Sequence, residues 1–516
     1  MLRAPAWPPD QRITAWPDLT GPDAGPASWR AWLACTWQTP GFAAAVEQAS
    51  PDLARRGRDI CAGRRMSDLA MRRAVLSVMR YLLRSSGRAT PFGLFAGIAP
   101  MRISSAPDLP AVHSGDAHRP RARVTAEWLG GVVQRLEGET ALRRRLKVTA
   151  NNLVFERDGR LVLEHRPSTE AGGASGHVSV RATGPVRTAL RLARDPLLVS
   201  DLITRLSAAS PRAAETTVDT LVAELVAQRL LFTSLRPPMT RCDPLRHLLQ
   251  ELDAVNAWEI GEVADIVKSL HALADELAAH DRAPVAATGE YRARAVVAMA
   301  GIHHTKRPPL SVDLRLDGEV TVPAAVASEA ATAAAALVRL ARRPVLSAVW
   351  VAWHERFLDR YGPRALVPLR DVVDADIGLG YPAGYDGAHA PEEVILADRD
   401  RKLLAMAHNA ALRRQREILL DDDMIADLGG VGPDAPVQPT TELTVRIEAP
   451  TPRALAEGRF TLVVVGASRA VGRSTSASPR TAPCCAPKWT APASPCCAPP
   501  LKWTRPDGSV APATSS

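Results

Sequence analysis

The chain has 516 residues, a formal net charge of +9, and 46% hydrophobic residues. This length and composition indicate a globular protein with more than one domain and exclude a fibrous or wholly disordered chain. The sequence has no uninterrupted apolar run of membrane-spanning length and no apolar segment near its start, so it predicts neither a membrane span nor a secretory signal. Its excess of positive charge suits a polyanionic partner without identifying one.

The cysteines fall into two groups. Cys35, Cys61 and Cys242 are widely spaced, which predicts reduced thiols in a cytoplasmic protein. The others form the adjacent pairs Cys484-Cys485 and Cys496-Cys497. Adjacent cysteines suit a tetrahedral metal site poorly, so we prefer a low-complexity tail without metal, with metal binding as the alternative.

Residues 1–147 predict mixed helices and strands. The segment ending near Gly87 has a helical apolar period, with Arg80 and Arg84 four residues apart on one side. Like charges at this spacing repel. A bound anion and a solvated arginine face both remain open interpretations. Gly87 is a plausible C-terminal cap, and Arg88 is expected on the turn that Pro91 enforces.

Residues 148–238 predict a separate small unit. The turn Asp158-Gly159 between two alternating runs predicts a hairpin over 153–163. A strand, three amphipathic helices and a second strand follow, at 177–181, 184–194, 197–208, 213–229 and 230–235, which is the composition of a winged helix. The third helix carries Glu215, Asp219 and Glu224, which disfavours DNA binding. A purely structural subdomain remains an alternative.

Residues 239–473 continue the larger domain, and the expected elements come in this order. They are a mostly helical segment to 283, a basic loop at 303–307, an Asp-Gly hairpin at 312–322, an Ala-rich surface helix at 329–341, a helix at 346–361, an irregular loop at 362–387, a charged helix at 398–419, a helix start at 421–423, and strands at 444–447 and 460–465. The basic loop is expected to be solvated, with contact to RNA phosphate as the alternative. Residues 474–516 are Pro- and Ser-rich and predict a disordered tail.

One catalytic motif can be set aside. The strand leading into Gly466-Ala-Ser468 is similar to the nucleophile elbow of an α/β-hydrolase. That mechanism needs a histidine after the serine, and no histidine follows His408.

A family resemblance rests on several blocks. Residues 80–97 read RYLLRSSGRATPFGLFAG. They resemble the signature of class I lanthipeptide (lantibiotic) dehydratases, in whose N-terminal glutamylation domain an arginine helix leads into a Thr-Pro-Phe/Tyr-Gly-Leu-Phe-Ala-Gly turn. Further blocks match in the same order at residues 2–5, 126–129, 311–314, 357–362, 367–369 and 378–382. Their number and order extend the resemblance over residues 1–473.

The resemblance implies an α+β fold. A mixed helix and sheet glutamylation domain would be formed by residues 1–147 and, incompletely, by 239–473. An inserted winged-helix-like subdomain at 148–238 would bind the leader peptide, and 474–516 would be the disordered tail.

The implied reaction is transfer of glutamate from glutamyl-tRNA to Ser or Thr hydroxyls of a ribosomally made precursor peptide, the first step of lanthipeptide dehydration. One ester is exchanged for another, so neither a cofactor nor a metal is expected, and glutamyl-tRNA is a co-substrate. The expected partners are this tRNA and the leader and core of the precursor. A cyclase and a second copy of the chain are further candidates, and DNA is not expected.

The resemblance also assigns residues by matching motif. The expected catalytic residues are Arg80, Arg84, Arg88, Thr90 and, more weakly, Asp313; the expected tRNA-binding residues are Arg3, Arg469 and Arg473. The leader peptide is expected to add a strand beside Val178 and Val180. The sequence names no general base.

Two departures from the family pattern bear on activity. Thr125 stands where the family usually has Asp, with Glu127 nearby. After Arg473 the family's Gly-Arg-Phe continuation is missing, and so is its elimination domain. We therefore expect an enzyme fragment, incompetent alone, from a frameshifted or degraded gene. The alternatives are a split glutamyltransferase with a separate eliminase, and a non-catalytic leader-binding module or pseudoenzyme remnant.

Overall fold

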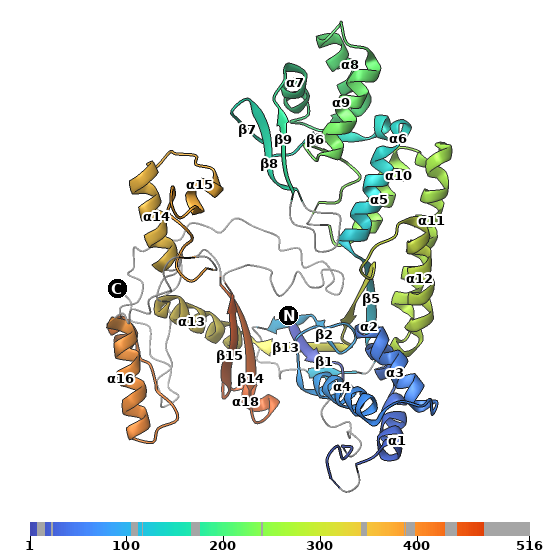
Figure 1. Cartoon of the computed structure of the whole chain (residues 1–516). Coiled ribbons are helices and arrows are strands. Elements are labelled where there is room, and N and C mark those ends of the chain that lie inside the picture. The colour runs from blue at the N-terminus through green and yellow to red at the C-terminus, as the bar shows by residue number, and fades with distance from the viewer. Residues whose placement is uncertain are drawn as a thin grey trace. The chain divides into compact units, whose positions relative to one another are not determined.

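The computed structural model describes residues 1–7, 16–21, 24–104, 112–115, 117–166, 176–238, 241–341, 348–385, 388, 398–428 and 441–468 (Figure 1). The chain divides into two compact units. Met1–Met101 and Val112–Val320 belong to the first, and Arg102–Ala111 and Thr321–Ser476 to the second. The predicted tail, 474–516, lies outside the described residues.

In the first unit, four helices follow a short N-terminal strand: α1 (Pro26–Trp37), α2 (Phe42–Ala49), α3 (Pro51–Cys61) and α4 (Asp68–Gly87). The hydroxyl of Ser67 caps α4 by accepting a hydrogen bond from the backbone N–H of Ala70. The helix buries Met71, Val75 and Val78 in the core. Three of its four leucines, Leu69, Leu76 and Leu83, are exposed, so the buried stripe is narrower than the apolar period predicts.

A four-stranded sheet organises this unit. It has the order β1 (Leu2–Pro5), β2 (Ala96–Ala99), β12 (Leu310–Arg315) and β5 (Arg119–Val124). Apolar side chains on one face, such as Val312, Leu314 and Ala122, join the main hydrophobic core. Helices α5 (Ala126–Gly138), α10 (Pro244–Ala254), α11 (Gly261–Arg282) and α12 (Thr288–Ile302) contribute to that core, together with the short η1 (Ala257–Glu259). A second short 3-10 helix, η2 (Val285–Ala287), precedes α12.

The predicted second hairpin is wrong in its pairing. Its strands exist as β12 and β13 (Gly318–Pro323), but β13 joins a different sheet, with the order β3 (Met101–Ser104), β13, β4 (Val112–Ser114). The residues of the Asp-Gly dipeptide, Asp317 and Gly318, lack the positive φ that a tight hairpin turn requires. Instead, the N–H of Gly115 donates to the carbonyl of Asp317, and the Asp317 N–H donates to Nδ1 of His118.

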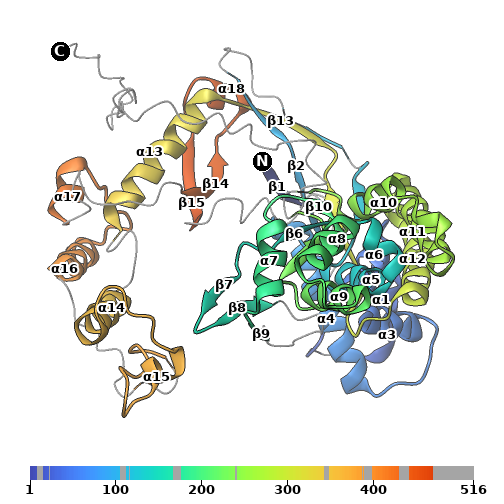
Figure 2. The same cartoon turned by 90° about the horizontal axis from the view of Figure 1, so that it is seen from above.

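Residues 147–233 of the same unit form a subdomain with its own hydrophobic core. Two three-stranded antiparallel sheets, β10-β6-β11 and β7-β8-β9, accompany three helices. The elements are β6 (Lys147–Ala150), β7 (Phe155–Arg157), β8 (Arg160–Arg166), β9 (Gly176–Arg181), α7 (Gly184–Leu192), β10 (Leu197–Leu198), α8 (Val199–Ala209), α9 (Glu215–Ala227) and β11 (Leu231–Thr233), and α6 (Thr140–Arg145) precedes them. This matches the winged-helix prediction. In both views the β7-β8-β9 ribbon extends away from α8 and α9 (Figures 1 and 2).

The Asp158-Gly159 hairpin is confirmed between β7 and β8. Both turn residues have positive φ, 51° and 69°, which is the geometry of a type I′ turn. The same dipeptide therefore makes a hairpin here and none at residue 317, where the turn residues hydrogen-bond to another segment.

The second unit contains α13 (Ala324–Leu340), α14 (Ala348–Tyr361), α15 (Leu369–Val373), α16 (Asp398–Leu412), α17 (Asp422–Asp427), α18 (Pro452–Ala456) and the antiparallel pair β14 (Glu442–Glu448) and β15 (Thr461–Ser468). Helix α13 packs against both strands. Asp421 caps α17, as predicted, whereas the segment predicted as an irregular loop contains α15. Cys35, Cys61 and Cys242 are free thiols. None of the helices in the described ranges is long and apolar enough to cross a membrane.

Candidate functional site

The C-terminal end of α4 carries the arginine motif. The helix runs to Gly87, and Arg88 is the capping residue, with an extended backbone and its N–H donating to the carbonyl of Arg84 at 3.1 Å. Gly87 is thus the last helical residue and not a left-handed cap, which corrects the sequence interpretation. The positive φ lies further on, at Gly93, where the chain turns toward β2.

The motif contributes four expected site residues, Arg80, Arg84, Arg88 and Thr90. Of these, Arg84 packs against an aromatic ring. Its guanidinium lies over the ring of Phe92, 4.3 Å from the centroid, and Phe92 in turn stacks on Phe95. Burial, and then the charge of Arg88, lower the pKa of Arg84. A cation over an aromatic face is stabilised by the ring quadrupole, so the guanidinium plane has a fixed orientation. Arg80, Arg88 and Thr90 are exposed.

The N-terminal strand joins this helix end to the sheet. The Ala6 N–H donates to the carbonyl of Phe95 at 2.9 Å, and the Trp7 N–H donates to that of Ser85 at 3.2 Å. Within β1, Arg3 lies opposite Ile98 of β2. The strand that carries Arg3 is therefore joined by hydrogen bonds to the C-terminal end of α4 and to β2.

Asp313 lies on the sheet face turned away from the core. Alternation along β12 places Ser311, Asp313 and Arg315 on this face, and alternation along β5 adds Arg119, Arg121 and Arg123. With Arg3 of β1, these residues form what we call the polar sheet face. In the register of β12 and β5, Asp313 lies opposite Arg121 and Ser311 lies opposite Arg123.

Ion pairs fix two of these arginines. The carboxylate of Asp313 pairs with the guanidinium of Arg123 on the neighbouring strand. Arg121 instead reaches Asp281 of α11, at 3.3 Å, and the same carboxylate accepts the N–H of Ala122. Arg121 and Arg123 are not among the residues that the family motifs mark. Their alternation in Arg-Pro-Arg-Ala-Arg at 119–123 was the signal that could have found them.

Thr125 has a structural position beside this face. Its hydroxyl accepts a hydrogen bond from the Trp128 N–H and caps α5, and its own N–H donates to the carbonyl of Pro309. Asp and Thr are both good N-caps, so the fold does not depend on which of them stands here. Arg469 and Arg473 lie outside the described residues.

The expected peptide-binding valines lie on β9, whose inner neighbour is β8. Val178 pairs with Leu163 and is 7% exposed, in the core of the subdomain, and Val180 is half-buried against that core. Their side chains therefore anchor β9 to the subdomain. Its outer edge has no partner strand among the described residues, so an added peptide strand would meet backbone groups of β9.

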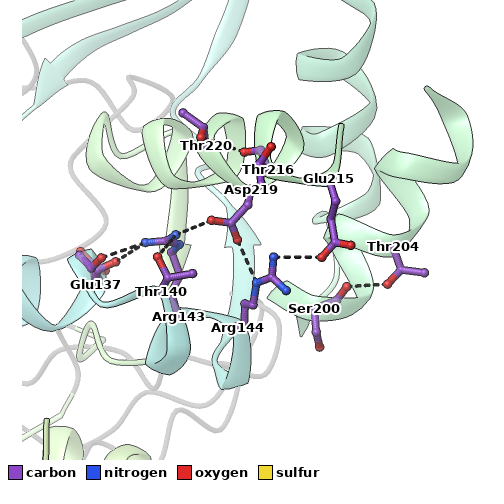
Figure 3. Close-up of polar contacts among 11 residues, drawn as sticks. Glu137, Thr140, Arg143, Arg144, Ser200, Thr204, Glu215, Thr216, Asp219 and Thr220 are labelled. Atoms are coloured by element: carbon purple, nitrogen blue, oxygen red, sulfur yellow. Dashed lines mark hydrogen bonds and ion pairs between the residues drawn. The ribbon is translucent and has the colours of Figure 1, made fainter. Parts of the chain in front are cut away.

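An ionic junction, defined by Glu137, Arg143, Arg144 and Asp219, connects the two cores of the first unit (Figure 3). The Arg143 side chain is 4% exposed and pairs with Asp219 of α9 at 2.9 Å, while a second N–H contact reaches the carbonyl of Glu137. Arg144 bonds the other oxygen of Asp219 at 3.1 Å. Two of the three acidic residues that argued against DNA binding, Glu215 and Asp219, thus pair with arginines of α6.

Comparisons with known proteins agree with this fold. The family described as lantibiotic dehydratase, N terminus, matches residues 38–478. Subtilin biosynthesis protein SpaB of Bacillus subtilis is 26% identical over 320 residues, covering 60% of this chain and 29% of SpaB. Epidermin biosynthesis protein EpiB of Staphylococcus epidermidis is 22% identical over 335 residues, covering 65% of this chain and 33% of EpiB. The chain therefore spans about a third of these curated relatives.

Solved structures of similar proteins share this fold. The tRNA dependent lantibiotic dehydratase MibB from Microbispora sp. 107891 is 33% identical, with a TM-score of 0.69, over 86% of this chain and 43% of MibB. The glutamylation domain of TbtB, from thiomuracin biosynthesis, has a TM-score of 0.56 at 17% identity, over 86% of this chain and 55% of that one, and shows the likeness of fold. The predicted mixed helix and sheet fold is confirmed, and the chain belongs to the lantibiotic dehydratase family, to whose N-terminal region it corresponds.

Proposed function

We propose that this chain transfers glutamate from glutamyl-tRNA to Ser or Thr hydroxyls of a ribosomally made precursor peptide, the first step of lanthipeptide dehydration. The observation that carries the proposal is the assembly of Arg3, Arg84 and Asp313 by β1, the end of α4 and β12. The relative MibB, which is described as tRNA dependent, supports it through a shared fold at 33% identity.

The chemistry is the exchange of one ester for another. The hydroxyl oxygen of Ser or Thr attacks the glutamyl carbonyl carbon, and the ribose oxygen of the tRNA leaves and takes up the proton that the attacking hydroxyl loses. Because the tRNA ester is already the activated donor, no separate activation step is needed, and the protein contributes chiefly by holding two large substrates in register. Arginine suits the RNA end because its planar guanidinium binds phosphate in a bidentate manner and stays charged.

Each residue then has a proposed role. Arg84, oriented by Phe92, would contact the RNA end together with the exposed Arg80, Arg88 and Thr90. Asp313 would receive the glutamyl ammonium group, with its carboxylate already oriented by Arg123. Arg469 and Arg473 remain candidates on the sequence pattern alone.

The peptide substrate has a separate proposed site. The leader would add a strand to the outer edge of β9, where backbone groups supply the hydrogen bonds and side chains at alternate positions supply selectivity. This leaves the core of the precursor free to reach the polar sheet face.

Mass spectrometry tests the proposal directly. The purified full chain is incubated with glutamyl-tRNA and precursor peptide, and with uncharged tRNA as the control. A mass gain of one or more glutamyl units, only with the charged tRNA, is expected. Leader binding without any gain would favour the non-catalytic leader-binding module, which Thr125 in the place of the family's Asp also favours. If the chain neither binds the leader peptide nor adds a glutamyl unit to the precursor, both interpretations are overturned.

A further inference from the structure

Three arginines form one row across the four-stranded sheet. Arg3 of β1 lies opposite Ile98 of β2, Ile98 lies opposite Arg315 of β12, and Arg315 lies opposite Arg119 of β5. Residues opposite one another on paired strands point to the same face, so the three side chains share the polar sheet face. With neighbouring strands about 4.8 Å apart, the row extends over about 14 Å. We call Arg3, Arg315 and Arg119 the arginine row.

The row is electrostatically unfavourable as it stands. Like charges placed directly opposite one another on paired strands destabilise a sheet, and Arg315 faces Arg119 in this way. Among the residues that the structure describes, none of the three side chains has an ion pair or hydrogen bond, whereas Arg121 and Arg123 on the same face are both paired. Arg119 is exposed, and Arg3 and Arg315 are half-buried. An arginine stem can cover an apolar neighbour while its charged end stays in solvent, which accounts for the buried Ile98 between them.

The direction of strands β2 and β12 places the arginine row relative to Arg84 and Asp313 of the proposed site. The chain enters β2 from the turn that holds Phe92, so Ala96 marks the end of β2 beside Arg84. Ile98 and the arginine row lie two residues further along, about 7 Å from Ala96. Asp313 precedes Arg315 by two residues on β12 and so lies between the row and the end of α4.

We propose that the arginine row binds phosphodiester groups of the tRNA acceptor strand, next to the terminal nucleotide that carries the glutamyl ester. This rests on the proposed function and deepens it. Three cations spread over about 14 Å match a ligand with repeated negative charges. The glutamyl group has a single free carboxylate, and one guanidinium is enough to bind one carboxylate.

Salt-dependent RNA binding tests this assignment without requiring transfer. Fluorescence anisotropy measures the affinity of uncharged, glutamate-specific tRNA over a KCl series for the full chain and for Arg315→Gln, Arg119→Gln and the double variant. Arg205→Gln is the matched control, because Arg205 is exposed on α8, away from the four-stranded sheet, and has no ion pair or hydrogen bond with any described residue. Each substitution in the row should weaken binding roughly two- to five-fold. It should also lower the slope of log affinity against log salt by about 1, and the control should leave both unchanged.

The outcomes separate this proposal from the transfer activity. If the row variants bind uncharged tRNA like the unmodified chain while transfer is slowed, the arginines act on the glutamyl group or the peptide, and the phosphate assignment is overturned. If tRNA binding depends on the row but no variant transfers glutamate, the row is supported and the proposed function fails. Circular dichroism of each variant checks that the sheet is intact.

Discussion

At the scale of single residues, the arginines of the signature are not equivalent. Arg84 is half-buried and stacked on Phe92, whereas Arg80 and Arg88 are exposed. A stacked guanidinium is restricted to one orientation, while an exposed arginine must lose rotamer freedom when it binds. Arg84 is therefore the member of the motif that is organised before substrate arrives.

The substitution Arg84→Lys tests this organisation. Lysine keeps the charge but has no planar group to stack on Phe92 or to bind phosphate in a bidentate manner. We expect the glutamyl transfer rate to fall roughly ten-fold, corresponding to the 1–2 kcal/mol typical of a desolvated cation over a ring. The control Arg73→Lys replaces an exposed arginine on the same helix and should leave the glutamyl transfer rate nearly unchanged. Equal rates for the two variants would show that charge alone matters at position 84.

At the scale of elements, local patterns set which segments become helices and strands, but not their partners. The Asp-Gly dipeptide illustrates this. At 158–159 both residues have positive φ and the flanking strands pair, whereas at 317–318 the flanking strands join different sheets. The difference arises because His118 and Gly115, far away in the sequence, hydrogen-bond to Asp317.

The ionic junction between α6 and α9 gives a prediction at this scale. Asp219→Asn would leave Arg143, with a side chain 4% exposed, without its carboxylate partner. Removing one partner of a buried ion pair costs about 3 kcal/mol, because the remaining charge stays desolvated. Hydrogen exchange of the α9 amides should report a local opening free energy lower by that amount.

Glu215→Gln is the matched control for the junction. Glu215 pairs with Arg144 of the ionic junction, but the Glu215 side chain is 63% exposed. Exposed pairs contribute less than about 1 kcal/mol. A loss of protection in α9 as large as that of Asp219→Asn would mean that burial of Arg143 is not the cause.

At the scale of the whole molecule, the first unit has two hydrophobic cores, one under the four-stranded sheet and one inside the subdomain of residues 147–233. Arg3, Arg84 and Asp313 belong to elements around the first core, and the β9 edge belongs to the second. The proposed tRNA and peptide sites are thus built on separate cores joined by the ionic junction.

Separate cores predict independent binding of the two substrates. Distant sites without shared partners contribute nearly additively. Arg84→Lys should therefore leave the Kd for leader peptide unchanged, as measured by calorimetry, while slowing transfer. Ser179→Pro, which removes a backbone N–H from β9, should weaken leader binding without changing the affinity for tRNA. Loss of leader affinity in Arg84→Lys would show that the two sites are coupled.

The sequence by itself determined the elements and the motif residues of this protein. Hydrophobic period, Asp-Gly turns and the order of motif blocks predicted the arginine helix, the winged-helix-like subdomain and the mixed fold, because these depend on neighbours along the chain. Tertiary structure alone decided which charges meet. The ion pair of Asp313 with Arg123 and the row formed by Arg3, Arg315 and Arg119 depend on strand order and register. Those arise from pairing between strands far apart in the sequence, such as β2 with Ile98 and β12 with Arg315, which no local pattern records.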